Sequence, residues 1–188
     1  MTPERSCSDH CPSFRDLRPA TRWTGRLFYE KVFGPEGSHE GEARMQVGTQ
    51  EDLEIERIAR NTRTIAVVGL SPKADRPSWG VARYLQSQGY RIVPVNPGHA
   101  GQEILGERVY GDLGDIPADL QIDMVDIFRR ADAVPAIVDE ALAELPGLST
   151  IWMQLGIAHP DAATKARRAG VTVIEDRCPK IEFPRHLR

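Results

Sequence analysis

The sequence predicts an α/β protein with a Rossmann-like fold, in which an open parallel sheet carries helices on both faces. Three observations support this fold class. Short continuous apolar runs recur between residues 51 and 188, and such runs are typical of strands buried on both faces of a parallel sheet. Segments with helical periodicity alternate with these runs. The crossovers are short, so each strand–helix–strand unit should be right-handed.

The elements follow in order from Thr49. Thr49 and Asp52 resemble a capping box, which predicts that a first helix begins there. Pro94 argues mildly against the second strand, because proline donates no hydrogen bond to a ladder. Residues 102–113 are irregular, with room for a short strand pair, and the chain after Glu175 is expected to be a charged tail. The strands are expected at 64–68, 91–95, 122–127, 150–153 and 171–174, and the later helices at 79–88, 133–145 and 160–169.

Residues 1–50 differ in character from the rest of the chain. They are rich in proline and glycine, and only 23–33 is locally apolar, which favours one short helix or strand. We interpret them as a flexible N-terminal extension, with 34–48 as a linker. An alternative hypothesis is that Met45 is the true start, because the regular pattern begins just after it. Cys7, His10 and Cys11 are soft metal ligands, but a structural zinc site needs a fourth ligand and none lies nearby, so no metal is expected.

The composition is that of an ordinary globular protein: 40% of the 188 residues are hydrophobic and 27% are charged. The formal net charge of −3 gives no reason to expect binding to nucleic acid or to a bilayer. No apolar run approaches the roughly 18 residues that a membrane span needs. The N-terminus lacks an apolar stretch of the signal-peptide type. We therefore expect a cytoplasmic protein.

Function in such a sheet is expected in the loops that follow the strands, because ligands bind at the carboxyl ends of the strands. The first of these loops precedes a helix, whose free N–H groups and positive dipole end favour phosphate. A glycine there allows close backbone approach, serine hydroxyls can bind, and cations suit phosphate. The residues concerned are Gly69, Ser71, Lys73, Arg76 and Ser78. The alternative interpretation of this loop is a solvated surface turn.

Two features argue against a plain dinucleotide site. The glycine fingerprint GxGxxG is absent, and the loop is longer than the usual tight turn. The second strand ends in Asn96, where an NAD site favours a carboxylate for the ribose hydroxyls. A longer loop with two cations would instead tolerate an additional phosphate, which both NADP and CoA carry.

The other loops give weaker signals. Phe128 could pack on an adenine ring and Arg129 could reach a phosphate, although simple packing explains a phenylalanine as well. Gln154 is an uncharged polar group at a strand end, and Gly156 allows close approach. Cys178 lies between Arg177 and Lys180, which would lower the pKa of its thiol; a small residue packed beneath the site is the alternative. His159 lacks a nearby partner for general-base chemistry and is expected to be exposed before a helix.

Four groups of residues together resemble a known family: 67–71 with 76–78, 94–97, 125–129 with 137–141, and 152–156 with 176–180. The chain from about Glu51 resembles the stand-alone CoA-binding proteins of bacteria and archaea. These are similar to the N-terminal CoA-binding domain of the succinyl-CoA synthetase alpha chain. The segment 98–101 also resembles the phosphohistidine motif of that enzyme. There the histidine belongs to a second domain, so we interpret His99 as a turn residue.

The resemblance implies a Rossmann-like domain with a single bound CoA. By position, it implies phosphate contacts from the first loop, a nucleotide pocket lined by the second and third loops, and a pantetheine end at the fourth. The residues are Gly69, Ser71, Lys73, Arg76 and Ser78 for phosphates; Asn96 and Pro97, with Ile127, Phe128 and Arg129, for the nucleotide; and Gln154 and Gly156 for pantetheine. Residues 1–50 fall outside the family pattern.

Four functions are compatible with these observations. The first is a CoA-binding or acyl-CoA-binding protein without catalysis of its own, acting as a carrier, sensor or regulator, because no acid–base pair or activated nucleophile is evident. The second is an NADP-dependent oxidoreductase, which the phosphate loop permits but for which no hydride-transfer partner is evident. The third is a subunit that lends a CoA site to a ligase complex. The fourth is redox control through a mixed disulfide between Cys178 and the CoA thiol.

Overall fold

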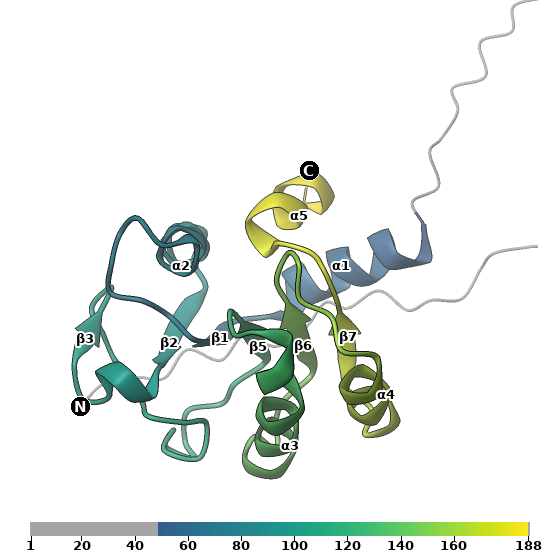
Figure 1. The fold of residues 1–188 in the computed structure, drawn as a ribbon. Coiled ribbons are helices and arrows are strands. Elements are labelled where there is room, and N and C mark those ends of the chain that lie inside the picture. The colour runs from purple at the N-terminus through teal and green to yellow at the C-terminus, as the bar shows by residue number, and fades with distance from the viewer. Residues whose placement is uncertain (1–48, 188) are drawn as a thin grey trace, which may run out of the picture. The chain divides into compact units, whose positions relative to one another are not determined.

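The structure, a computed structural model, describes residues 49–187. Residues 1–48, including Met45, the apolar stretch 23–33 and the Cys7–His10–Cys11 group, lie outside the described residues. The described residues form α1 (Gln50–Asn61), β1 (Thr64–Val68), α2 (Pro77–Ser87), β2 (Arg91–Val95), β3 (Glu103–Ile104), β4 (Glu107–Arg108), β5 (Met124–Ile127), α3 (Val134–Glu144), β6 (Thr150–Met153), α4 (Pro160–Arg168), β7 (Thr172–Ile174) and α5 (Pro179–His186), with short 3₁₀ turns at η1 (Pro97–His99) and η2 (Ala131–Ala133) (Figure 1).

The main sheet confirms the predicted fold class. Its five strands run in the order β2-β1-β5-β6-β7, and every neighbouring pair is parallel. The predicted strand pair between residues 102 and 113 is the small antiparallel hairpin of β3 and β4. The chain leaves β1 for the edge strand β2 and then returns to β5 on the other side of β1. The carboxyl ends of β1 and β5 therefore flank the topological switch point, where α/β proteins bind ligands.

Helices cover both faces of this sheet, as Figure 1 shows. On one face, α3 and α4 pack their apolar side chains over the alternate strand residues that include Val125 and Ile151. On the other face, α1, α2 and α5 cover the residues between them, including Met124 and Trp152. Strands that are buried on both sides explain the continuous apolar runs in the sequence.

Local sequence signals account for the element boundaries. The capping box of α1 is present: the Thr49 hydroxyl accepts from the Asp52 N–H (3.2 Å), and the Asp52 carboxylate accepts from the Thr49 N–H (2.7 Å). Pro94 is tolerated because β2 is an edge strand of the main sheet. The Asn96 N–H faces away from β1 and bonds to the Tyr110 carbonyl. Pro94 lies two residues earlier, so its nitrogen also faces away from β1, and the missing N–H does not interrupt the ladder with β1.

The predicted charged tail after Glu175 is wrong, because the chain forms helix α5 there. Phe183 is 1% exposed and packs edge-on against Trp152, with ring centroids 5.5 Å apart, and against Tyr90 at 5.6 Å. Arg177 pairs with Glu51 of α1 (3.0 Å) and with the buried Glu182 (3.6 Å). The charges that suggested a solvated tail therefore connect α5 to α1. Helix α2 also begins at Pro77 rather than at Trp79, which places Ser78 inside its first turn.

None of the helices within residues 49–187 combines the length and the apolar character that crossing a bilayer requires.

Candidate functional site

The loop after β1 meets the loop after β5 at Gly69. The backbone of Gly69 has a φ of +90°, which favours glycine. A Cβ at this position would lie 2.9 Å from Cδ of Arg129 and 3.1 Å from the carbonyl oxygen of Phe128. The Phe128 N–H also bonds to the Val68 carbonyl (2.9 Å). Only a residue without a side chain allows these two loops to approach so closely.

Two serine hydroxyls shape the first loop. The hydroxyl oxygen of Ser78, which is 5% exposed, accepts from the Ser71 N–H at 3.2 Å. The hydroxyl oxygen of Ser71 in turn accepts from the Lys73 N–H, also at 3.2 Å. Within residues 49–187 each hydroxyl acts only as an acceptor in these bonds, so its O–H is free to donate. The loop thus folds with two O–H donors close to the start of α2.

The N-terminus of α2 has no side-chain cap. Arg76 occupies the N-cap position, and its side chain makes no capping hydrogen bond. The Trp79 and Gly80 N–H groups share the Arg76 carbonyl, at 3.1 and 3.2 Å. Helix N-termini carry partial positive charge and bind phosphate readily. Lys73 and Arg76 are exposed beside this end, and in the described part of the chain their side chains make no ion pair or hydrogen bond.

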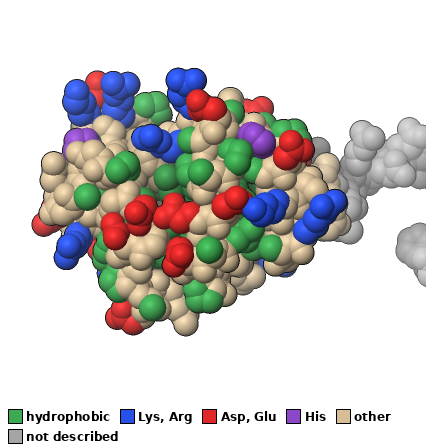
Figure 2. Space-filling view, turned by 60° about the horizontal axis from the view of Figure 1, so that its bottom comes forward, with side chains coloured by type: hydrophobic (Ala, Val, Ile, Leu, Met, Phe, Trp, Pro, Cys, Tyr) green, Lys and Arg blue, Asp and Glu red, His purple; other side chains and the backbone are tan. Residues whose placement is uncertain are grey.

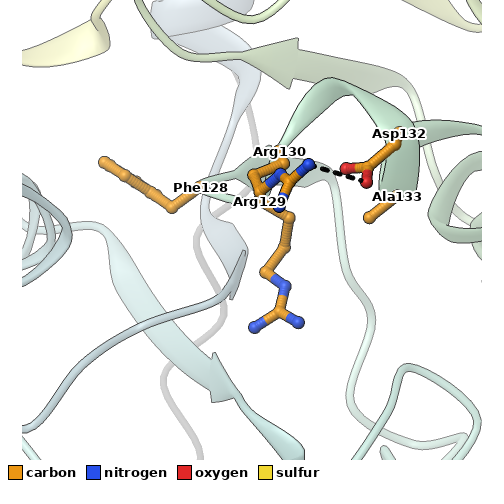
Figure 3. Close-up of a pocket in the computed structure, with 5 residues that line it drawn as sticks. All are labelled: Phe128, Arg129, Arg130, Asp132 and Ala133. Atoms are coloured by element: carbon orange, nitrogen blue, oxygen red, sulfur yellow. Dashed lines mark ion pairs between the residues drawn. The ribbon is translucent and has the colours of Figure 1, made fainter.

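The loop after β5 supplies a third cation and a pocket. Phe128, Arg129, Arg130, Asp132 and Ala133 line a pocket of about 550 Å³ (Figure 3). Arg130 pairs with Asp132 at 3.3 Å, whereas the Arg129 side chain extends away from that pair. Phe128 is half-buried and packs against the core on the α2 side of the sheet, and Ile127 is fully buried.

The charge on the surface is unevenly distributed, although the net charge is small. On the face shown in Figure 2, basic side chains gather along one border and acidic side chains form a band across the middle. Exposed cations such as Lys73, Arg76 and Arg129 are therefore compatible with a net charge of −3.

Asn96 joins the second loop to the first. Its side-chain amide donates to the Leu70 carbonyl at 2.8 Å, and its side-chain oxygen accepts from the Gly98 N–H at 3.0 Å. Pro97 begins the following 3₁₀ turn and is exposed. His99 is part of the same turn, where its ring contacts Gln102 at 3.2 Å, as expected for a turn residue. The side chain of Asn96 is thus used largely to hold the loop after β1.

Asp126 was not among the residues predicted for the site. Asp126 is fully buried in β5, and both its carboxylate oxygens accept from the side-chain nitrogen of Gln154, at 2.9 and 3.1 Å. Burial raises the pKa of Asp126 to about 7, and the hydrogen bond from Gln154 opposes that rise. The available signal was a carboxylate inside an apolar run, because such a group needs a polar partner once it is buried.

Gln154 itself is 5% exposed and lies just after the end of β6. Gly156 lies further along the same loop with a φ of +77°, and its N–H bonds to the Asp176 carboxylate at 2.6 Å. Both residues follow β6, the next strand beyond β5. Contacts therefore connect the ends of β1, β2, β5 and β6. The side chains of Lys73 and Arg76 are exposed and make no hydrogen bond or ion pair within residues 49–187, and Pro97 is exposed as well.

Cys178 is buried at the N-terminus of α5, and this favours the packing interpretation of the residue. Burial is the main cause that raises the pKa of its thiol, and the charge of Asp126 raises it further. Arg177 is engaged with Glu51 and Glu182, and Lys180 lies 5.9 Å above the Tyr84 ring. The thiol pKa is therefore raised overall, against the expectation: Lys180 does lower it, but burial outweighs that effect, and Arg177 is not among the causes. His159 caps α4 by accepting from the Ala162 N–H at 3.3 Å.

Metal ligands do not gather in the described part of the chain. Among residues 49–187, no group of three or more His, Cys, Asp or Glu side chains is placed to hold an ion. The fold and the loops define the class of protein: a Rossmann-like α/β domain whose candidate site lies where β1 and β5 end.

Comparison with known proteins gives the family. The model of the CoA binding domain family matches residues 63–184, and the chain belongs to this family. The Bacillus subtilis (strain 168) protein YneT, described as uncharacterized, is 38% identical over 129 residues, which are 68% of this chain and 90% of that protein.

Solved structures agree with this assignment. Cell-free ID.343 from Thermus thermophilus is 36% identical, with a TM-score of 0.67 over 72% of this chain and 98% of that chain. A hypothetical protein from Pyrococcus horikoshii OT3 is 34% identical, with the same TM-score over 73% of this chain and 92% of that chain. The fold is also found in part of a dinucleotide forming acetyl-coenzyme A synthetase from Ca. Korarchaeum cryptofilum, at 23% identity and a TM-score of 0.53, over 64% of this chain and 27% of that chain.

Proposed function

We propose that this chain binds CoA or acyl-CoA at the loops after β1, β2, β5 and β6, and that it acts as a carrier, sensor or regulator without catalysis of its own. The observation that carries the proposal is the uncapped N-terminus of α2 beside Lys73 and Arg76, whose charges have no partner in the described residues. Membership of the CoA binding domain family supports CoA as the ligand.

The chemistry of CoA matches the distribution of groups along these loops. Its phosphates would be held by the α2 N-terminus and by groups around Gly69. The adenine would pack near the half-buried ring of Phe128, and the uncharged pantetheine arm would run toward the polar end of β6. The residues assigned are Gly69, Ser71, Lys73, Arg76, Ser78 and Arg129 for phosphates; Asn96, Pro97, Ile127 and Phe128 for the nucleotide; and Gln154 and Gly156 for pantetheine.

Isothermal titration of the full-length protein with CoA tests this proposal, with NADP as the competing ligand. The double variant Lys73→Ala/Arg76→Ala should weaken CoA binding roughly 100-fold, because each charge-assisted contact contributes about 1.5 kcal/mol. The matched control is Lys165→Ala/Arg168→Ala, which removes the same charge from α4 on the opposite face of the sheet.

The control variant should bind CoA as the wild type does. Equal losses in both double variants would indicate a diffuse charge effect and would remove the assigned site. Binding of NADP in preference to CoA would instead support the oxidoreductase.

A further inference from the structure

Asp126 and Gln154 form a buried polar pair between the ends of β5 and β6. Asp126 and Met124 lie on the same face of the sheet, and so do Gln154 and Trp152; this is the face covered by α2 and α5. Asp126 is 0% exposed and Gln154 is 5% exposed. Among residues 49–187, the amide of Gln154 is the only hydrogen-bond donor to the Asp126 side chain.

The amide of Gln154 has one end engaged and one end open. Its nitrogen Nε2 lies 2.9 Å from Oδ1 and 3.1 Å from Oδ2 of Asp126. Its oxygen Oε1 accepts no hydrogen bond from the described residues. No buried side-chain oxygen or nitrogen in that part of the chain lacks a partner, so Oε1 is not enclosed in the core. It remains accessible where β6 ends.

The charge of Asp126 determines which end of the amide faces outward. An ionised carboxylate only accepts hydrogen bonds, so the –NH₂ group of Gln154 must turn toward it. The carbonyl end then necessarily points the other way. A glutamine without such a partner would present either end, and its side chain would keep more rotational freedom.

We propose that Asp126 is a positioning residue that fixes the amide of Gln154, so that Oε1 accepts a hydrogen bond from an S–H donor of the bound ligand. The inference rests on the proposed function, under which the donor is the thiol at the end of the pantetheine arm. Free CoA carries the thiol donor, whereas an acyl thioester replaces it with a carbonyl acceptor. The orientation of Gln154 therefore favours free CoA over acyl-CoA.

Protonation of Asp126 reverses this preference. A protonated carboxyl donates one hydrogen bond, so the Gln154 amide can turn and present its –NH₂ group to the ligand. Burial places this titration near neutral pH. The titratable group that faces Asp126 from another element is the Cys178 thiol, whose own pKa is raised, so it stays neutral through this range. Binding of a donor ligand is then strongest above the Asp126 pKa and weakens as the pH falls through it.

The test is calorimetric titration of the full-length protein with dephospho-CoA and with acetyl-dephospho-CoA, between about pH 5.5 and about pH 8.5. Dephospho-CoA lacks the 3′-phosphate, whose own titration near pH 6 would otherwise enter the profile. The wild type should prefer the free thiol about tenfold more at the upper pH than at the lower pH, which is the effect of one hydrogen bond.

The variant Asp126→Asn keeps the shape of the side chain and removes the titration. Its preference between the two ligands should be independent of pH, while the exposed control Asp139→Asn should retain the wild-type profile. If Asp126→Asn does not fold, the wild-type profile alone decides, because the pH-dependent preference needs no variant. A preference that does not change with pH in the wild type overturns the inference and leaves the proposed function intact. Absence of binding to CoA itself overturns both.

Discussion

Arg129 lies directly over Gly69, with its Cδ 2.9 Å from the place where a side chain on that glycine would begin. The contact joins the ends of β1 and β5, the two strands that flank the switch point of the sheet. Four residues of the loop after β1, Ser78 in the first turn of α2, and Arg129 after β5 are the groups that the proposed CoA site assigns to phosphate. The geometry of this one contact therefore affects the whole candidate site.

Gly69→Ala should weaken both the fold and ligand binding. The methyl group must displace Arg129 or the Phe128 carbonyl, and alanine is disfavoured at a φ of +90°, so the free energy of unfolding should fall by about 1–3 kcal/mol. Urea unfolding and CoA titration measure the two effects. Gly80→Ala is the matched control: its Cβ meets nothing within 4 Å inside helix α2, so stability should hold or rise by about 0.5–1 kcal/mol. Equal free energies of unfolding for Gly69→Ala and Gly80→Ala would refute the close approach of the two loops.

Asn96→Asp should destabilise the first loop. The substitution removes the donor to the Leu70 carbonyl and sets two acceptors against each other, at a cost of about 1–3 kcal/mol. CoA affinity should fall as well, because the loop carrying Ser71 loses its connection to β2. Gln102→Glu makes the same amide-to-acid change in an exposed turn and should alter stability by less than about 0.5 kcal/mol. Denaturant unfolding at neutral pH measures the free energy of unfolding of both variants.

Phe183→Ala should unfold much of the contact between α5 and the sheet. The ring is buried between Trp152 and Tyr90, and truncation of a buried phenylalanine costs about 3–5 kcal/mol. Ile181→Ala on the same helix serves as the control, because that side chain is 42% exposed. A loss below about 1 kcal/mol for Phe183→Ala in urea unfolding would mean that α5 is not part of the cooperative core.

The stability of the wild type should depend on pH through Asp126. The folded-state pKa of about 7 lies above the ordinary value of 3.8, so the stabilising form is the protonated one. This contribution is fully present below the unfolded-state pKa and is lost as the pH rises through about 7. The difference amounts to at most about 4 kcal/mol. Asp126→Asn should therefore gain stability relative to the wild type between about pH 4 and about pH 8.

Unfolding of both proteins across that range measures the difference. Parallel stability curves for wild type and variant would contradict the buried, weakly acidic state of Asp126.

Much of the fold could be predicted from the sequence because buried parallel strands are visible as continuous apolar runs. The runs at 64–68, 91–95 and 150–153 coincide with β1, β2 and β6, since burial on both faces demands continuous apolar residues. Helix α5 was not predicted, because its own sequence carries no clear helical pattern. It contains Pro184 and many charges, and what holds it is the contact of Phe183 with rings that lie far away in the sequence.

In the candidate site, too, features set by local sequence could be predicted, whereas features set by tertiary contacts could not. Gly69 and the loop after it follow from the position of a glycine between a strand and a helix. The pairing of Asp126 with Gln154 depends on the register of β5 against β6, and periodicity carries no information on register. The net direction of the Cys178 pKa shift was wrong because burial of the thiol, which the sequence does not show, outweighs the lowering effect of Lys180. Arg177 in fact turns away to Glu51.

Backbone amide spectra of the isotope-labelled protein, recorded during titration with CoA, test the central claim most directly. If CoA binds at these loops, the largest shifts should fall on Gly69, Ser71, Ser78 and Arg129, with a second group at Gln154 and Gly156. Shifts confined to the opposite edge of the sheet, for example around Arg57 and Thr172, or no shifts at all at millimolar CoA, would contradict it.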